Sequence, residues 1–366
     1  MTDAAGGSAA GLGAITDRAR VIVCCGSGGV GKTTTAALIA LEAARRGRRA
    51  VVVTIDPARR LADALGLDEL TNDPATITGP WPGELAALML DTEGTFNNLV
   101  KRYAGSPDQA ERILENRFYK NIAGALSGTQ EYMATEKLYE LYTDTPYDLI
   151  VVDTPPTRNA LDFLEAPNRL ASFLEHRLYR MVTAPTRGLV RAVNMATQTF
   201  FRSVGKVVGG DVIADAIGFF AAFEGMEDGF RHRARDVEAL LASPETSFVL
   251  VTAPKPETIA ETSFFASRLT ELHITVRAVI VNRIHPIFGE TSAAEAAARA
   301  AELGDTPLGH LFHCLAQLNA IAESDLCQLG GLDDDTGGAP VITVPLQPYE
   351  VHDLDTLTDL AQYLYR

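Results

Sequence analysis

A glycine-rich stretch from Gly26 to Thr34, with the sequence GSGGVGKTT, carries the clearest chemical pattern in the chain. It matches G-x-x-x-x-G-K-[ST], follows the apolar run Val21 to Cys25 and opens a helical stretch. Glycines let backbone N–H groups curve around phosphate oxygens without Cβ clashes, and the lysine adds a cation. A turn without a ligand is the alternative, but the strand before it and the helix after it favour a phosphate loop. The predicted phosphate contacts are Gly28, Gly29, Val30, Gly31, Lys32, Thr33 and Thr34, with the Thr33 hydroxyl also binding Mg²⁺.

Two carboxylates follow predicted strands and are expected at the same sheet edge as this loop. Asp56 ends the second apolar run, and Asp153 ends the fourth. Ligands of open α/β sheets bind at the carboxyl ends of the strands, so both acids are expected beside the phosphates. We predict that Asp153 binds Mg²⁺ or its water shell and that Asp56 orients the attacking water. Either acid alone could simply cap a strand end, whereas both after a phosphate loop indicate catalysis by Lys32, Asp56 and Asp153.

The elements that must position these residues alternate short β-branched runs with long helical stretches, a pattern typical of a mostly parallel sheet covered by helices. Together with the loop this predicts an α/β fold of the P-loop NTPase class, with about seven strands. The predicted strands are Val21 to Cys25, Ala50 to Ile55, Leu85 to Leu90, Asp148 to Val152, Ser247 to Val251, Val276 to Val281 and Val341 to Val344. The predicted helices are Thr33 to Arg46, Thr258 to Leu272, Ala293 to Glu302 and Tyr349 to Leu364.

Two connections between strands are too long for ordinary crossovers and indicate an inserted helical subdomain, at about residues 92–146 and 159–243. Residues 1–16, rich in glycine and alanine, are expected to be a disordered tail before a single domain over residues 17–366.

The second insertion contains a basic segment: residues 166–210 hold seven basic residues and one acidic residue. Apolar residues there recur every three or four positions, at Leu189, Val193, Ala196, Phe200, Val204 and Val207. This stripe either faces a core or docks a hydrophobic or membrane partner.

The composition restricts the function classes. A net charge of −15 repels phosphate backbones, so we expect no nucleic-acid partner. Four cysteines without a CxxC pair give neither a disulfide framework nor a zinc motif, which predicts no zinc and a reducing cytoplasm. No leader or membrane span is expected. The remaining His/Cys cluster fits no zinc template and consists of His310, His313, Cys314 and Cys327.

Three segments carry a family resemblance: GSGGVGKTT, then TIDPARRLAD, then VVDTPPTRNALDFL. They closely resemble the arsenite-pump (ArsA) and Get-pathway ATPases, the latter targeting tail-anchored membrane proteins, within the deviant Walker A group. The resemblance extends to LMLDTEGTF, VIVNR and VPLQPYEV, and so covers nearly the whole chain from Val21 onward. It implies a nucleotide-gated dimer that binds ATP or ADP with Mg²⁺, with Asp56 in switch I, Asp153 in switch II and a client-binding subdomain after switch II. It also places Asn282, Pro345 and Leu346 around the adenine.

One departure from the family pattern concerns catalysis. The family reads GKGGVGKT, in which the first lysine reaches the partner's nucleotide, and this chain has Ser27 there. A cation supplied by a partner to a transferring phosphoryl group is worth about 10³ to 10⁵ in rate. We therefore expect slow or partner-dependent hydrolysis, either by a homodimer in which Arg59, Arg60 or Arg158 replaces the lysine, or by a heterodimer with a lysine-bearing paralogue.

Three functions remain open. The first is a Mg·ATP-dependent dimeric ATPase whose helical subdomain binds a hydrophobic client or membrane-protein segment as the nucleotide changes. The second is a nucleotide-binding, weakly catalytic or non-catalytic subunit of a heterodimeric complex. The third is a MinD- or ParA-like positioning ATPase, against which the acidic C-terminus argues. Arsenite transport is not expected, because the chain holds one ATPase half and scattered cysteines. All three predict a cytoplasmic protein, and the first allows peripheral membrane contact.

Overall fold

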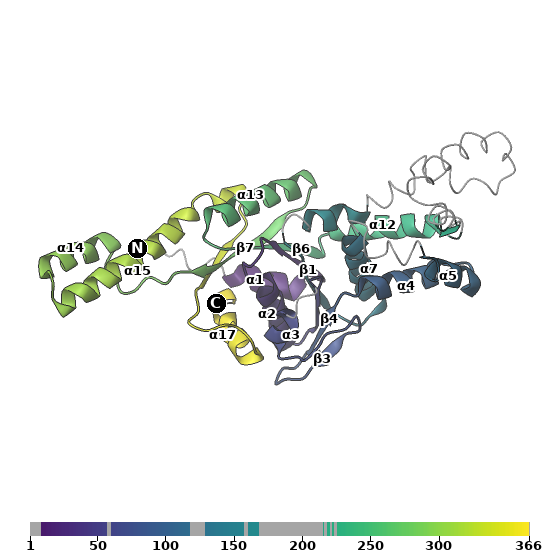
Figure 1. The fold of residues 1–366 in the computed structure, drawn as a ribbon, viewed down its shortest axis with the longest axis horizontal. Coiled ribbons are helices and arrows are strands. Elements are labelled where there is room, and N and C mark those ends of the chain that lie inside the picture. Colours follow the sequence, from purple (N-terminus) through teal and green to yellow (C-terminus); the bar gives the residue numbers. More distant parts are fainter. Residues whose placement is uncertain are drawn as a thin grey trace. The chain divides into compact units, whose positions relative to one another are not determined.

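The computed structural model describes residues 9–56, 60–117, 129–156, 160–167, 215, 218–219, 222 and 225–365. The chain divides into two compact units. The first consists of Met1–Met89, Thr145–Ala160 and Pro244–Arg366, and the second of Leu90–Asp144 and Leu161–Ser243. The first unit contains the sheet, and the described elements of the second are all helices (Figure 1).

One eight-stranded sheet forms the centre of the first unit, in the order β3-β4-β2-β5-β1-β6-β7-β8. All neighbouring strands are parallel except β3 and β4. This confirms the predicted α/β fold with a mostly parallel sheet. The strands are β1 (Val21–Gly26), β2 (Arg49–Thr54), β3 (Ala75–Ile77), β4 (Glu84–Met89), β5 (Leu149–Asp153), β6 (Thr246–Thr252), β7 (Val276–Ile284) and β8 (Val341–Pro345).

The eighth strand, β3, is the difference from the prediction of about seven. It has three residues, pairs antiparallel with β4 and lies at the edge of the sheet. A strand this short has no alternation of its own to recognise, so its pairing partner decides its structure.

Helix α2 (Lys32–Arg45) is buried along most of its length. Five of its buried residues are alanines, whose small side chains let the helix lie close to the sheet, where it contacts β2 and β5. The remaining helices of this unit are α1 (Ala9–Arg18), α3 (Arg60–Leu65), α13 (Pro256–Glu271), α14 (Ala293–Leu303), α15 (Pro307–Gln328), α16 (Leu332–Asp335) and α17 (Leu354–Leu364).

Both ends of the chain differ from the expectation. Residues 9–16 belong to α1 rather than to a disordered tail, because Leu12 and Thr16 are buried and Thr16 Oγ1 lies 2.8 Å from the Tyr365 hydroxyl. Residues 1–8 lie outside the described residues. The C-terminal helix begins at Leu354 instead of Tyr349, since Asp353 forms a capping box with Thr356.

Helix α15 is absent from the predicted elements. Part of it runs beside α14, with which it packs (Figure 1). Several of its large apolar residues, Leu308, Leu311, Leu318, Ile321 and Leu326, are exposed. Apolar residues distributed in this way give no clear core-facing stripe, so the pattern does not separate this helix from a loop.

The second unit contains α4 (Thr92–Tyr103), α5 (Pro107–Leu114), α7 (Thr129–Asp144) and α12 (Glu227–Leu241). Phe230, Met133 and Val100 are among the buried side chains of these helices. The basic segment at residues 166–210 lies outside the described residues apart from its first two. None of the helices in the described ranges is long and apolar enough to cross a membrane.

Candidate functional site

Two glycines, one at the end of β1 and one directly before α2, lie where a side chain does not fit without a shift of its surroundings. Gly31 precedes α2 with φ 99°, and a Cβ there would overlap the side-chain amide of Asn282. That amide donates to the Val30 carbonyl over 2.9 Å. Gly26 sits against the Val251 carbonyl, where a Cβ would also collide. The loop therefore has the narrow, Cβ-free geometry of a phosphate cradle.

Asp153 lies beneath this loop at the end of β5. Its Oδ2 accepts hydrogen bonds from Thr33 Oγ1 (2.7 Å) and Thr54 Oγ1 (3.0 Å). Its Oδ1 is buried and accepts no hydrogen bond from any residue in the described ranges. Burial raises the pKa of Asp153 to about 6, against the lowering effects of the Thr33 hydrogen bond and the Lys32 charge.

A divalent cation would satisfy this carboxylate. Mg²⁺ prefers hard oxygen ligands, and the Thr33 hydroxyl and the Asp153 carboxylate are such donors, already 2.7 Å apart beside the cradle. A buried carboxylate oxygen without a partner is costly, and bound metal or its water would remove that cost. These residues therefore fit the magnesium site predicted from the sequence.

Lys32 is buried at the start of α2, and its Nζ donates to the Ser27 carbonyl over 2.8 Å. Burial lowers the pKa of Lys32, and the charges of Asp153 and Asp56 oppose that effect. Asp56, partly exposed after β2, also raises the pKa of Asp153. The structure thus brings Lys32, Asp56 and Asp153 within electrostatic reach of one another.

Ser27, the position of the expected family lysine, does not face solvent. It is buried, and its hydroxyl donates to Glu261 Oε2 over 2.5 Å. Glu261 lies on α13 and was not among the predicted site residues. Its position in the middle of a helix far along the chain gives no sequence signal for this contact.

Arg283 is a second residue that the sequence did not indicate. Its guanidinium donates to the Gly29 carbonyl of the loop over 3.1 Å. The residue has φ 64° and lies where the β7–β8 register shifts, between Asn282 and Ile284. Such a bulge re-aims a side chain, here toward the phosphate loop. The only available signal was its place next to Asn282.

The residues predicted to contact adenine lie together at the carboxyl ends of β7 and β8. Asn282 pairs with Val344 in the β7–β8 register, and the Leu346 N–H donates to the Ile284 carbonyl over 2.8 Å. Leu346 follows Pro345 and is exposed, which leaves an apolar side chain for a base to contact.

Of the arginines proposed to replace the family lysine, Arg60 begins α3. Its charge lowers the pKa of Lys32, although burial is the largest cause of that lowering. Arg59 and Arg158 lie outside the described residues.

The His/Cys cluster is spread over α15. His310 pairs with Asp305 over 2.7 Å, and His313 lies 3.2 Å from Gln317. Cys314 and Cys327 are exposed. Across the described ranges, no three His, Cys, Asp or Glu side chains come together as a metal site. Cys24 and Cys25 are buried in β1, and burial raises the pKa of both thiols, that of Cys25 to about 12.

Comparison with known proteins gives a consistent result. The family model of the anion-transporting ATPases matches residues 19–302. The chain is 24% identical to "ATPase GET3" of Malassezia globosa over 94% of this chain and 90% of that protein. It is 29% identical to "ATPase ARSA2" of Chlamydomonas reinhardtii over 73% of this chain and 67% of that protein. It is 24% identical to the "Putative arsenical pump-driving ATPase 1" of Aquifex aeolicus over 73% of this chain and 64% of that protein.

Proposed function

Since this chain belongs to the anion-transporting ATPase (ArsA) family, we propose that it hydrolyses ATP with Mg²⁺ at the loop of residues 26–34. Its relatives are named as ATPases, and the family relationship leads us to expect nucleotide and Mg²⁺ here. One observation carries the assignment to these residues. The Asp153 carboxylate is tied to Thr33 of the loop while its buried Oδ1 has no partner in the described ranges.

Each residue of the site has a distinct role in this proposal. The N–H groups from Gly28 to Thr34 and the Lys32 ammonium bind the phosphates, and Thr33 and Asp153 hold the metal. Mg²⁺, when bound, supplies positive charge that offsets the charge developing on the phosphates. Asp56 accepts a hydrogen bond from the attacking water and orients it toward the phosphorus. Asn282, Pro345 and Leu346 bind the base.

The second unit is proposed to bind a hydrophobic client or a partner protein. Support comes from chain order: one of its two segments starts at Leu161, eight residues after Asp153, and the other at Leu90, directly after β4. A change in nucleotide that moves the segment after Asp153 would be passed along the chain into this unit. We further propose a cytoplasmic dimer, with a second copy or a lysine-bearing paralogue, as the working assembly.

A weakly catalytic subunit is the second candidate, and one contact favours it. Ser27 has no positive charge to offer a partner, and its hydroxyl donates to Glu261 of the same chain. Arg60 and Arg283 are the described residues that could supply one instead, Arg283 already reaching the loop. The positioning-ATPase alternative gains no support, because the apolar residues Leu357, Leu360 and Leu364 of α17 are buried in the core.

Phosphate release by the full chain, alongside calorimetric ATP binding, tests the proposal. Lys32→Ala should abolish binding, whereas Asp56→Asn should bind ATP and lose at least about 100-fold in rate. Glu302→Gln, on the exposed face of α14, is the matched control and should behave as wild type. Wild-type turnover by Asp56→Asn would contradict the assigned role, and ATP binding without turnover in any variant or complex would favour the second candidate.

A further inference from the structure

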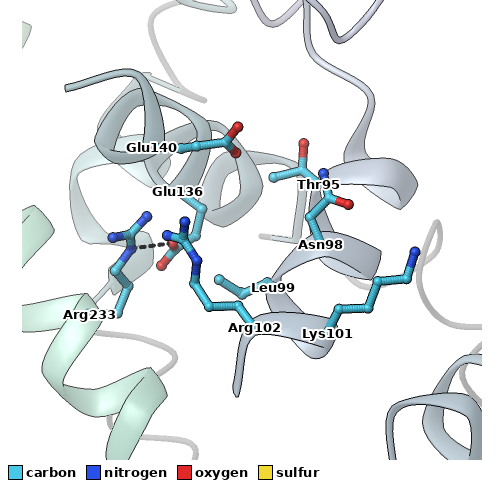
Figure 2. A pocket seen from close by; sticks show the side chains of 8 residues that line it. All are labelled: Thr95, Asn98, Leu99, Lys101, Arg102, Glu136, Glu140 and Arg233. Carbon is cyan, nitrogen blue, oxygen red and sulfur yellow. Dashed lines mark hydrogen bonds and ion pairs between the residues drawn. The ribbon is translucent and has the colours of Figure 1, made fainter. Parts of the chain in front are cut away.

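The second unit contains a polar cavity that the proposed ATPase site does not use. Its volume is about 430 Å³, within the roughly 300–1,000 Å³ range of small-molecule sites. Figure 2 shows side chains from α4, α7 and α12 around it. The lining residues all belong to this unit and are Thr95, Asn98, Leu99, Lys101, Arg102, Glu136, Glu140 and Arg233.

The acidic groups of the cavity are already engaged. Glu136 is buried and accepts from the Tyr132 hydroxyl (2.6 Å) and from Arg233 Nε (2.7 Å). Glu140 accepts from the buried Lys137 ammonium over 3.1 Å. The carboxylates therefore do not require a cationic ligand.

The basic groups, by contrast, have N–H donors that no acceptor in the described ranges engages. Arg233 is 7% exposed and uses only its Nε, so neither terminal nitrogen donates to any residue in the described ranges. Its guanidinium lies over the Tyr139 ring at 4.0 Å, which fixes its plane. Arg102 uses one terminal nitrogen on Asp144, and Lys101 has no ion-pair partner among the described residues. The terminal N–H groups of Arg233 and Arg102 can therefore donate to an acceptor that enters the cavity.

The charges around the cavity also favour an anionic ligand. Among the residues that line the cavity, three are cations, Lys101, Arg102 and Arg233, and two are carboxylates, Glu136 and Glu140. Both Arg102 and Arg233 are close enough to Glu136 to lower its pKa, although burial raises that pKa overall. A structural ion pair needs one cation for each carboxylate, and here one positive charge remains.

We propose that this cavity binds a small metabolite through an oxyanion, a phosphate or a carboxylate, held by Arg102 and Arg233. Planar guanidinium groups match both oxyanions, and two of them can hold several oxygens at once. The Asn98 amide and the Glu140 carboxylate lie on the cavity wall, where they fit the hydroxyl groups of such a molecule (Figure 2). Lys101 adds a cation at the rim.

Calorimetric titration of the full chain with inorganic phosphate, and separately with citrate, tests this site at constant ionic strength without metal or nucleotide. We expect binding of at least one anion, weakened about 10- to 100-fold by Arg102→Gln, since a charged hydrogen bond is lost. Arg112→Gln removes the same charge from an exposed position on α5 of the same unit and should bind as wild type. Phosphate alone would indicate a phosphorylated ligand, and citrate alone a carboxylate.

Lys32→Ala separates this cavity from the phosphate loop, which also attracts anions. Anion binding that survives Lys32→Ala and is lost in Arg102→Gln supports the cavity, whether or not the chain hydrolyses ATP. Binding lost only in Lys32→Ala, equal binding by Arg102→Gln and wild type, or no binding of either anion would overturn the proposal. Because removing Arg233 would leave Glu136 buried without its partner, Arg102 is the better residue to change.

Discussion

Asp153 is the single residue whose surroundings matter most to the proposed site. Its folded-state pKa is about 6, above the ordinary value of 3.8, because the carboxyl is buried. Between pH 3.8 and about pH 6, the Asp153 carboxyl is therefore protonated in the folded protein to a greater extent than in the unfolded chain. It follows that the nucleotide-free protein gains stability from this group at low pH and loses it as the pH rises through 6.

Magnesium-dependent nucleotide binding should depend on pH in the opposite sense. The metal needs the ionised carboxylate, so affinity for Mg·ADP should fall up to about tenfold per pH unit below 6. Titrations between pH 7.5 and 5 measure this directly. The variant Asp153→Asn should lose the magnesium effect and, without nucleotide at pH 7.5, melt about 2–4 °C higher than wild type. Unchanged Mg·ADP affinity in that variant would remove Asp153 from the metal site.

Ser27 gives a second prediction for a single residue. Ser27→Lys should raise the ATPase rate of the chain alone at least about tenfold, because a cation would again be available to a partner's nucleotide. Ser27→Ala, which removes the hydrogen bond to Glu261 without adding charge, is the control. If wild type is already fast and Arg283→Ala slows it, the guanidinium on the Gly29 carbonyl supplies that charge instead. Identical rates in all four proteins would exclude both explanations.

Among the elements, α17 shows how a helix distant in sequence supports the loop. Its buried residues join the core cluster that also contains Ala40 of α2 and Cys24 of β1. Leu357 is fully buried there, and Leu357→Ala should lower the free energy of unfolding by about 2–5 kcal/mol through lost burial and a cavity. Gln362→Ala, on the exposed side of the same helix, should change it by less than about 0.5 kcal/mol. Urea unfolding of both variants measures the difference, and equal losses would mean that α17 is not part of the folding core.

For the whole molecule, the proposed dimer predicts that the sedimenting mass changes with the bound nucleotide at a fixed protein concentration. With Mg²⁺ and a non-hydrolysable ATP analogue, we expect the chain, alone or with a lysine-bearing paralogue, to sediment at the mass of two subunits, and with ADP to dissociate more readily. The physical reason is that the γ-phosphate, which ADP lacks, would hold the switch segments in the arrangement that binds the partner. Sedimentation velocity in both nucleotides checks this, with Lys32→Ala as the variant that should not respond. A monomer under all these conditions, with either partner, would contradict the dimer.

Those parts of this protein whose signal is local can be predicted from the order of its residues. Residue types and spacing over a few positions predict seven of the strands, and the sheet confirms the predicted fold. The same kind of local pattern leads to the proposed phosphate loop with Asp56 and Asp153. Contacts between distant segments become visible in the folded chain alone. They include the Ser27–Glu261 hydrogen bond, the Arg283 hydrogen bond to the loop, the pairing of the short strand β3, and the burial of Leu12 and Thr16 in α1. The cavity around Arg102 and Arg233 likewise forms between segments that are distant in the sequence. Each of these depends on the free energy of bringing remote residues together, which no short pattern along the chain records.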